Sequence, residues 1–214
     1  MLEVKALEVD IGSANILRQV ALAVPTGSLC GLIGRNGSGK TTLLRCVMGL
    51  LPAKAGAISF DGAHLDALPA HGRAGLGIGY MPEDRRLVPD FAVEDNVLVP
   101  AWAVGTAGAA ARLEWVYGLM PEVREFRARR ANQLSGGQQK LVALARALMA
   151  GRKLLLLDEP FEGVAPALAQ RLAEVLADLK TTGISVLVAE SNEKHIAHLL
   201  SAMHVIERGA IHPA

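Results

Sequence analysis

The 214-residue sequence predicts an α/β fold with a mostly parallel sheet, an N-terminal antiparallel β portion and an inserted helical subdomain. Apolar strand-like runs alternate with helix-like runs from residue 28 onward, which is typical of a parallel sheet covered by helices. The first two runs, up to residue 24, are joined by a short turn instead. Prolines and glycines break the helical segments between residues 82 and 131. We therefore expect a single domain over residues 1–214, with a core formed by 1–81 and 132–214 and a helical subdomain at 82–131.

Composition limits the classes of function. Lys and Arg number 22 against 21 Asp and Glu, so a net charge of +1 gives no reason to expect nucleic acid as a partner. The N-terminus lacks a signal-peptide core, and the uncharged stretches fall short of the roughly 18 apolar residues that a membrane-spanning helix needs. We expect a soluble chain. Cys30 and Cys46 are predicted to be buried and reduced, which fits the cytosol.

The first half of the chain reads mainly as strands separated by turn signals. Residues 2–11 alternate apolar side chains with a register break near Lys5 and Ala6. The Asp61-Gly62 pair after residues 57–60 indicates a hairpin. The remaining expected elements are strands at 17–24, 28–33 and 77–81, a helix at 41–48 and one helical turn at 69–73.

The second half returns to alternation after the helical subdomain. Helices are expected at 138–149, 166–180 and 193–200, and strands at 153–157, 184–189 and 203–206. Arginines cluster between residues 85 and 130 and could bind phosphate or nucleic acid. Acidic neighbours favour a solvated, salt-bridged surface instead.

A phosphate-binding pattern, G-x-x-x-x-G-K-T, joins the strand at 28–33 to the next helix. Glycines let backbone N–H groups approach phosphate oxygens, and the helix adds its positive N-terminal end. Lys40 would reach the β- and γ-phosphates, and the Thr41 hydroxyl would ligate Mg²⁺. A glycine-rich turn without a ligand is the alternative. The residues predicted to bind ATP in this stretch are Gly34, Arg35, Asn36, Gly37, Ser38, Gly39, Lys40, Thr41 and Thr42.

Two carboxylates, Asp158 and Glu159, follow four leucines at the expected carboxyl end of a buried strand. Open α/β sheets bind ligands at that end. Asp158 would hold Mg²⁺, and Glu159 would act as the catalytic group that polarises the attacking water, an effect of about 10²–10⁴ in rate. Taken alone, such carboxylates often only cap a following helix.

The stretch Leu134-Ser135-Gly136-Gly137-Gln138 opens the helix expected at 138–149. Its glycines would expose backbone N–H groups at a helix N-terminus, which is a second anion site. An ordinary Ser N-cap is the competing interpretation.

The chain resembles the nucleotide-binding subunits of ABC transporters, because the phosphate loop, the LSGGQ stretch and the Asp158-Glu159 strand occur in that family's order. The resemblance covers essentially the whole chain. It implies a P-loop NTPase core, ATP and Mg²⁺ as ligands, and hydrolysis of ATP in a head-to-tail dimer. Each ATP would lie between one phosphate loop and the partner's LSGGQ stretch, so Ser135, Gly136, Gly137 and Gln138 would serve the partner's nucleotide.

A finer similarity is to the shorter ATPase subunit of branched-chain amino acid importers. The stretches that carry it are 80–96 (YMPEDRRLVPDFAVEDN), 158–166 (DEPFEGVAP) and 190–192 (ESN). This resemblance implies a second ABC ATPase subunit, in a homodimer or heterodimer, and transmembrane permease subunits as partners, with a solute-binding protein engaged indirectly. The expected location is peripheral, on the cytoplasmic side of the inner membrane.

Four positions depart from the wider ABC pattern. Glu83 replaces a glutamine that contacts Mg²⁺, and Ser191 replaces a histidine that contacts the γ-phosphate. Glu83 could still ligate Mg²⁺, and Ser191 could hydrogen-bond but not carry charge. Ala165 replaces an aspartate, and Ile11 stands where an aromatic ring stacks on adenine. Ser191 and Ala165 therefore leave open a regulatory ABC subunit with weak hydrolysis. A non-transport ABC-type ATPase is a separate alternative, against which a single domain without basic excess argues.

Overall fold

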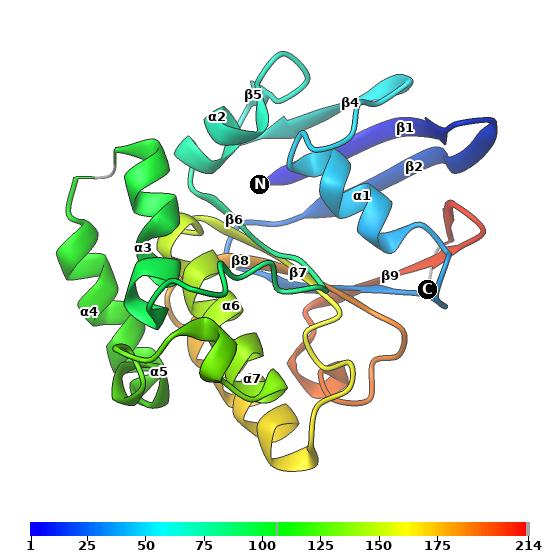
Figure 1. The fold of residues 1–214 in the computed structure, drawn as a ribbon. Coiled ribbons are helices and arrows are strands. Elements are labelled where there is room, and N and C mark those ends of the chain that lie inside the picture. The colour runs from blue at the N-terminus through cyan, green and yellow to red at the C-terminus, as the bar shows by residue number, and fades with distance from the viewer. Residues whose placement is uncertain (106, 213–214) are drawn as a thin grey trace.

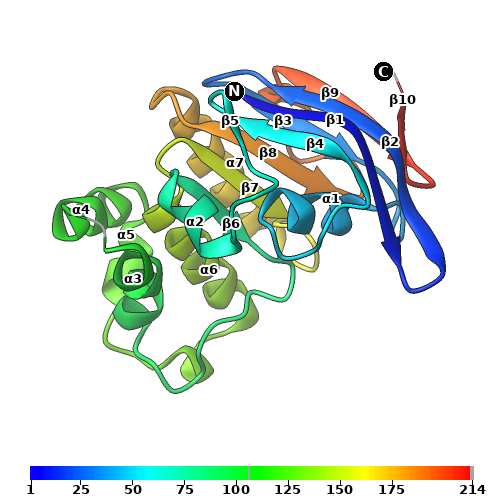
Figure 2. The ribbon, with the colours of Figure 1, turned by 90° about the horizontal axis from the view of Figure 1, so that it is seen from above.

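Two β-sheets and a group of helices make up the fold of the computed structural model, which describes residues 1–105 and 107–212. Helices α3 (Val93–Val104), α4 (Ala109–Leu119) and α5 (Pro121–Glu125) lie on one side of the molecule. The N-terminal sheet lies on the opposite side, as the view from above also shows (Figure 1, Figure 2). The predicted α/β class, with its N-terminal antiparallel part, is confirmed.

The N-terminal sheet has the strand order β2-β1-β4-β5 and is antiparallel throughout. The register of β1 shifts on both sides around Ala6, whose φ of 47° is left-handed. The break predicted near Lys5 and Ala6 is thus a β-bulge, which adds twist to the strand. The strands are β1 (Leu2–Ile11), β2 (Ala14–Val24), β4 (Ala55–Phe60) and β5 (Ala63–His64).

The second sheet has the order β10-β9-β3-β8-β7-β6, in which only the β10–β9 pair is antiparallel. Its central strands are continuous apolar runs, because helices or the other sheet cover both faces. All strands from β9 to β6 therefore end at the same edge. The strands are β3 (Leu29–Ile33), β6 (Ile78–Met81), β7 (Leu154–Asp158), β8 (Ser185–Glu190), β9 (Ala202–Glu207) and β10 (Ala210–His212).

The core is divided between the two faces of this second sheet. Helix α1 (Lys40–Val47) lies between the sheets (Figure 1), where Leu43 and Leu44 pack among apolar residues of both. Helices α6 (Gly136–Ala150) and α7 (Pro166–Lys180) cover the other face together with α3–α5. The short elements are α2 (Ala70–Gly75) and the 3₁₀ turns η1 (Ala131–Gln133) and η2 (Ala197–Leu199).

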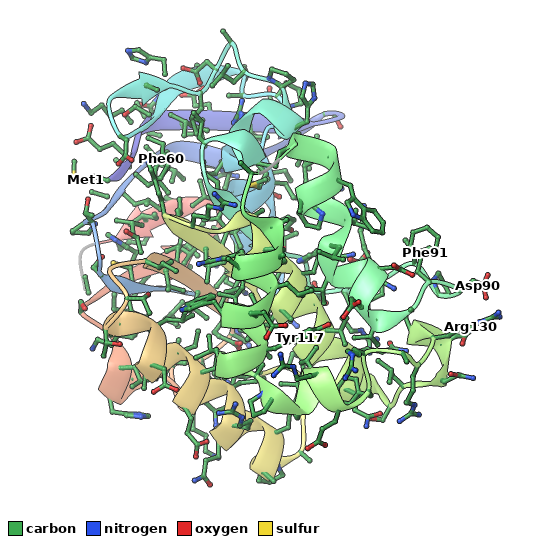
Figure 3. All side chains as sticks on the ribbon, turned by 90° about the vertical axis from the view of Figure 1, so that its left-hand side faces the viewer. Met1, Phe60, Asp90, Phe91, Tyr117 and Arg130 are labelled. Carbon is green, nitrogen blue, oxygen red and sulfur yellow. The ribbon has the colours of Figure 1, made fainter. Side chains whose placement is uncertain are left out.

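The chain just before α3 and the chain just after α5 lie together. Asp90 and Phe91 before α3 lie at the same end of the molecule as Arg130 after α5 (Figure 3), where Ala131 N donates to Phe91 O at 3.0 Å. Several arginines of this region are paired, such as Arg124 with Glu114, which supports the salt-bridged surface expected from the sequence. The subdomain boundaries remain a prediction.

The helix expected at 193–200 is wrong. The chain forms a turn there, followed by η2 at 197–199. Asn192 Oδ1 accepts the Lys194 N–H at 3.1 Å, and the N–H groups of Ile196 and Leu199 donate to carbonyls three residues earlier. The segment therefore tightens into 3₁₀-type turns instead of an α-helix. The antiparallel strand β10 was not expected either. In the described residues, no helix combines the length and apolar character needed to cross a membrane.

Candidate nucleotide-binding site

The phosphate loop lies between the end of β3 and the start of α1, at the carboxyl edge of the parallel sheet. Gly37 and Gly39 have φ values of 80° and 111°, which favour glycine. A Cβ on Gly34 would lie 2.3 Å from Ile206 O, so this glycine is required by packing. The N-terminus of α1 therefore opens onto a narrow backbone turn, as an anion site requires.

Polar groups of the loop fit a phosphate. Ser38 Oγ is buried and, within the described part of the chain, has no hydrogen-bond partner. Lys40 is 5% exposed, and its Nζ donates to Gly34 O at 2.5 Å and Arg35 O at 3.3 Å. The Ser38 hydroxyl is a buried donor without an acceptor, which is costly unless a ligand supplies one. The loop thus offers a hydroxyl and an ammonium to a ligand rich in acceptor oxygens.

Glu159 lies directly beside the phosphate loop. Its backbone is left-handed, with φ 47°, and its carboxylate pairs with Lys40 at 2.9 Å while both side chains are about 95% buried. Ser191 Oγ lies 3.1 Å from each carboxylate oxygen, and the Ser191 N–H donates at 3.2 Å. Strain at a buried carboxylate next to a lysine is a feature of functional sites.

Asp158, at the end of β7, is fully buried. It accepts hydrogen bonds from Thr41 Oγ1 at 3.1 Å and Tyr80 Oη at 3.2 Å. Burial raises its pKa to about 6 although these two hydrogen bonds lower it. A buried carboxylate beside a hydroxyl provides the oxygen donors that Mg²⁺ prefers. No group of three or more His, Cys, Asp or Glu suited to a metal occurs in the described residues, so the donor set would need ligand oxygens as well.

A cavity of about 360 Å³ lies over the phosphate loop. Ile11 and Ile16 form an apolar wall beside Gly37 and Gly39, as adenine contact would need. Glu83 also lines this cavity. Its pKa is raised by partial burial and by the nearby carboxylates of Glu162 and Glu159, which disfavour another negative charge. The cavity also contacts Asn36, Lys40, Thr41, Thr42 and Glu159.

Glu190 ends the neighbouring strand β8 and is buried. It accepts the Phe161 N–H at 2.8 Å, which fixes the chain just after Glu159. Burial is the main cause that raises its pKa to about 8, and the Glu159 carboxylate adds to the effect. The hydrogen bond from the Phe161 N–H opposes this rise in pKa, because it stabilises the charged carboxylate.

The LSGGQ stretch lies apart from the phosphate loop of its own chain. Ser135 Oγ accepts the Gln138 N–H at 3.2 Å, while Gln138 Oε1 accepts the Ser135 N–H at 3.0 Å. This capping box confirms the Ser N-cap that the sequence offered as one interpretation. Gly136 and Gly137 line a second cavity with Glu83 and Glu162. At the N-terminus of α6, Gly136 is exposed and Gly137 is half-buried.

The structure thus brings most predicted residues together and leaves one group apart. Residues 34–42, Thr41 with Asp158, and Glu159 with Ser191 form one site, and Glu83 lies at its edge. Residues 135–138 are outside this cavity. Tyr80 and Glu190 were missed. The sequence did contain a signal for Glu190. This carboxylate follows the apolar run 185–189, just as Asp158 follows the apolar run 154–157.

A family model described as ABC transporter matches residues 17–162. The high-affinity branched-chain amino acid transport ATP-binding protein BraG of Pseudomonas aeruginosa is 34% identical, over 99% of this chain and 91% of BraG. The lipopolysaccharide export system ATP-binding protein LptB of Escherichia coli is 33% identical, over 91% of this chain and 82% of LptB.

Solved structures agree with these matches. The ADP conformation of an ATP-binding cassette of an ABC transporter superposes with a TM-score of 0.84 at 26% identity, over 99% of this chain and 89% of the cassette. A dimeric bacterial ABC transporter cassette, at 23% identity, shares the fold with a TM-score of 0.87, over 100% of this chain and 97% of that one.

Proposed function

Since this chain belongs to the ABC transporter family, we propose that it is the ATP-hydrolysing subunit of an importer, with branched-chain amino acids as cargo. The observation that carries the hydrolytic part is the position of Glu159, whose carboxylate lies 2.9 Å from the phosphate-loop Lys40. Similarity to BraG along nearly the whole chain supports the cargo class.

In this proposal the phosphate loop binds ATP through its backbone N–H groups, Ser38 Oγ and Lys40. Phosphate oxygens would draw Lys40 away from Glu159, and the freed carboxylate would polarise the attacking water. Ser191 would keep Glu159 oriented through the contacts at 3.1 Å. Thr41, Asp158 and Glu83 would hold Mg²⁺, which when bound neutralises developing phosphate charge.

The exposure of the LSGGQ stretch at Ser135 and Gly136 supports a head-to-tail dimer with a second ABC ATPase subunit. Its glycines lie at the start of α6 and outside the nucleotide cavity of their own chain. Ser135, Gly136, Gly137 and Gln138 would then complete the partner's site. One chain alone would bind ATP but hydrolyse it slowly, because each site would lack its second wall.

A largely apolar groove of about 570 Å³ separates the core from α3 and offers a place for a permease helix. Met48 and Leu50 line it on the core side, and Val99 and Pro100 line it on α3. Glu83 and Asp158 also line this groove, and Glu83 lines the nucleotide cavity as well. Docking here would place the chain peripherally on the cytoplasmic side of the inner membrane, with residues 82–131 as a helical subdomain.

Steady-state ATP hydrolysis and ATP titration test the hydrolytic role. Lys40→Ala should weaken ATP binding severely, because buried phosphate charge loses its ion partner. Glu159→Gln should retain binding and lower turnover by at least about 10². Glu174→Gln, on the exposed face of α7, is the matched control and should behave as wild type. Unchanged affinity in Lys40→Ala together with unchanged turnover in Glu159→Gln would refute the proposal.

Reconstitution tests the cargo. The chain should be purified with its permease and second ATPase, placed in vesicles and supplied with a solute-binding protein. ATP-driven accumulation of leucine, abolished by Glu159→Gln, is the expected result. Extraction of a glycolipid without leucine uptake would assign the chain to export, as the similarity to LptB allows.

A regulatory subunit with weak hydrolysis is the second candidate. Ser191, where the family has a histidine, cannot add positive charge near the γ-phosphate. Normal binding with turnover below that of the partner subunit, unchanged when Glu159 is replaced by Gln, would favour it.

A further inference from the structure

We propose that Lys140 is a positioning residue for Glu159, and that it makes helix α6 a rigid link between the LSGGQ stretch and the hydrolytic carboxylate. This inference rests on the proposed hydrolytic function and adds a residue to it.

Lys140 lies in the second turn of α6, with 8% of its surface exposed. Its Nζ donates to Glu159 O at 2.9 Å, to Pro160 O at 3.2 Å and to Glu162 O. An ammonium has three donors, so these three main-chain carbonyls use its full capacity. One side chain thereby fixes four consecutive residues, 159–162, in a single conformation.

This segment needs such support. Glu159 adopts φ 47°, a conformation that non-glycine residues keep only when their surroundings hold it. The Glu159 side chain contacts Lys40 and Ser191, but its own carbonyl contacts Lys140. Lys140 therefore acts on the backbone of the carboxylate-bearing residue and leaves its reacting atoms free.

The positive charge of Lys140 also matters. Glu159, Glu162 and Glu190 all favour its charged state, while burial opposes it and lowers its pKa. A neutral side chain of equal size would leave the mutual repulsion of these carboxylates uncompensated and three carbonyls without a donor. Lys140 thus combines fixation of the loop with charge compensation.

The same helix holds a second strained loop in the same way. Arg146 donates to the carbonyls of Arg85 and Arg86, two adjacent residues with φ of 62° and 49°. This loop begins two residues after Glu83. A buried lysine and a half-buried arginine on one helix therefore fix the segments next to the proposed site residues Glu159 and Glu83.

The N-terminus of α6 is the LSGGQ stretch, only one turn before Lys140. A displacement of that end by the partner's nucleotide would move the Lys140 ammonium and, through three hydrogen bonds, the Glu159 backbone. Occupancy of one ATP site is thus transmitted to the hydrolytic group of the other by a single rigid helix.

Lys140→Met, which keeps length and removes donors and charge, tests this in the assembled ATPase. We expect kcat to fall about 10- to 100-fold, the range for a misplaced catalytic group, with KM for ATP within about twofold of wild type. Lys140→Gln, which retains amide donors, should give an intermediate kcat. Lys180→Met is the matched control, because Lys180 also donates to a helix-flanking carbonyl, Leu199 O at 2.7 Å, but far from the site. Its kcat should be unchanged.

The decisive measurement compares the loss of kcat caused by Lys140→Met in the wild-type protein and in the Glu159→Gln variant. If Lys140 acts through Glu159, Lys140→Met causes no further loss of kcat in the Glu159→Gln variant. An equal loss in both proteins indicates a structural role only and overturns the inference. Wild-type kcat in Lys140→Met also overturns it. Should Lys140→Met fail to fold, Lys140→Gln decides by the same two criteria. Unchanged turnover in Glu159→Gln alone would instead remove the proposed hydrolytic function.

Discussion

Asp158→Asn should stabilise the nucleotide-free protein while abolishing its activity. The Asp158 carboxylate is fully buried, and within the described residues its side-chain hydrogen bonds come from two neutral hydroxyl donors, at 3.1 and 3.2 Å. Asparagine keeps an oxygen acceptor of the same shape and removes the charge. A rise in pKa from 3.8 to about 6 corresponds to about 3 kcal/mol of destabilisation when the carboxyl is ionised. Because the new amide NH₂ also needs a partner, the expected gain is about 1–3 kcal/mol.

The gain should depend on pH in a defined window. Below pH 3.8 the carboxyl is protonated in both folded and unfolded chains and contributes nothing. Between pH 3.8 and about 6 the unfolded chain ionises while the folded chain keeps its proton, so the free energy of unfolding of wild type falls as pH rises. Above about pH 6 the loss is complete. The advantage of Asp158→Asn should therefore appear through this window and stay constant above it.

Urea denaturation without nucleotide or Mg²⁺, from pH 4 to 8, measures this difference, and thermal unfolding should shift by about 2–4 °C for each kcal/mol. ATP turnover at pH 7.5 should drop at least about 10², because the oxygen donor to Mg²⁺ is weakened. Tyr80→Phe is the control, since it removes one donor and should lower stability instead. A variant that is less stable than wild type at pH 8, or a difference that does not vary between pH 4 and 6, would refute the burial argument.

Ser191→Ala removes a hydroxyl that contacts both oxygens of Glu159, so kcat should fall about tenfold with little change in KM; an equal change in both constants would contradict an orienting role. Arg73→Met leaves the carbonyls of Cys46 and Val47 without their donor, so urea denaturation should show a loss of about 3 kcal/mol or more with unchanged ATP affinity. Gly34→Ala should abolish ATP binding, because its Cβ would lie 2.3 Å from a carbonyl oxygen; retained affinity in a titration would show that the loop can shift.

Local patterns predicted the parts of the site that are continuous in sequence. The strand, glycine loop and helix at 28–48 needed only neighbouring residues, as did the two carboxylates at the end of β7. Hydrophobic runs marked the buried strands correctly for the same reason. The prediction for segment 193–200 failed, because the chain forms tight three-residue turns there, where apolar spacing alone suggested an α-helix.

Contacts between distant segments could not be predicted in this way. Tyr80 reaches Asp158 because β6 pairs with β7, and Glu190 lies near Glu159 because β8 pairs with β7 on the other side. The order of parallel strands depends on the crossover connections between them, which no local sequence pattern reveals. The hydrogen bonds from Lys140 to the carbonyls of residues 159–162 likewise join a helix to a loop about twenty residues away.

The sequence by itself predicted a triphosphate site, because glycine positions, a lysine and two strand-end carboxylates act through local backbone geometry. It also indicated the family, through three motifs in order. Only the tertiary structure decided how the carboxylates are held: Asp158 buried between Thr41 and Tyr80, and Glu159 strained between Lys40, Ser191 and Lys140. The burial of each carboxylate and the charged groups around it decide this, and both arise when segments far apart in sequence pack at one edge of the sheet.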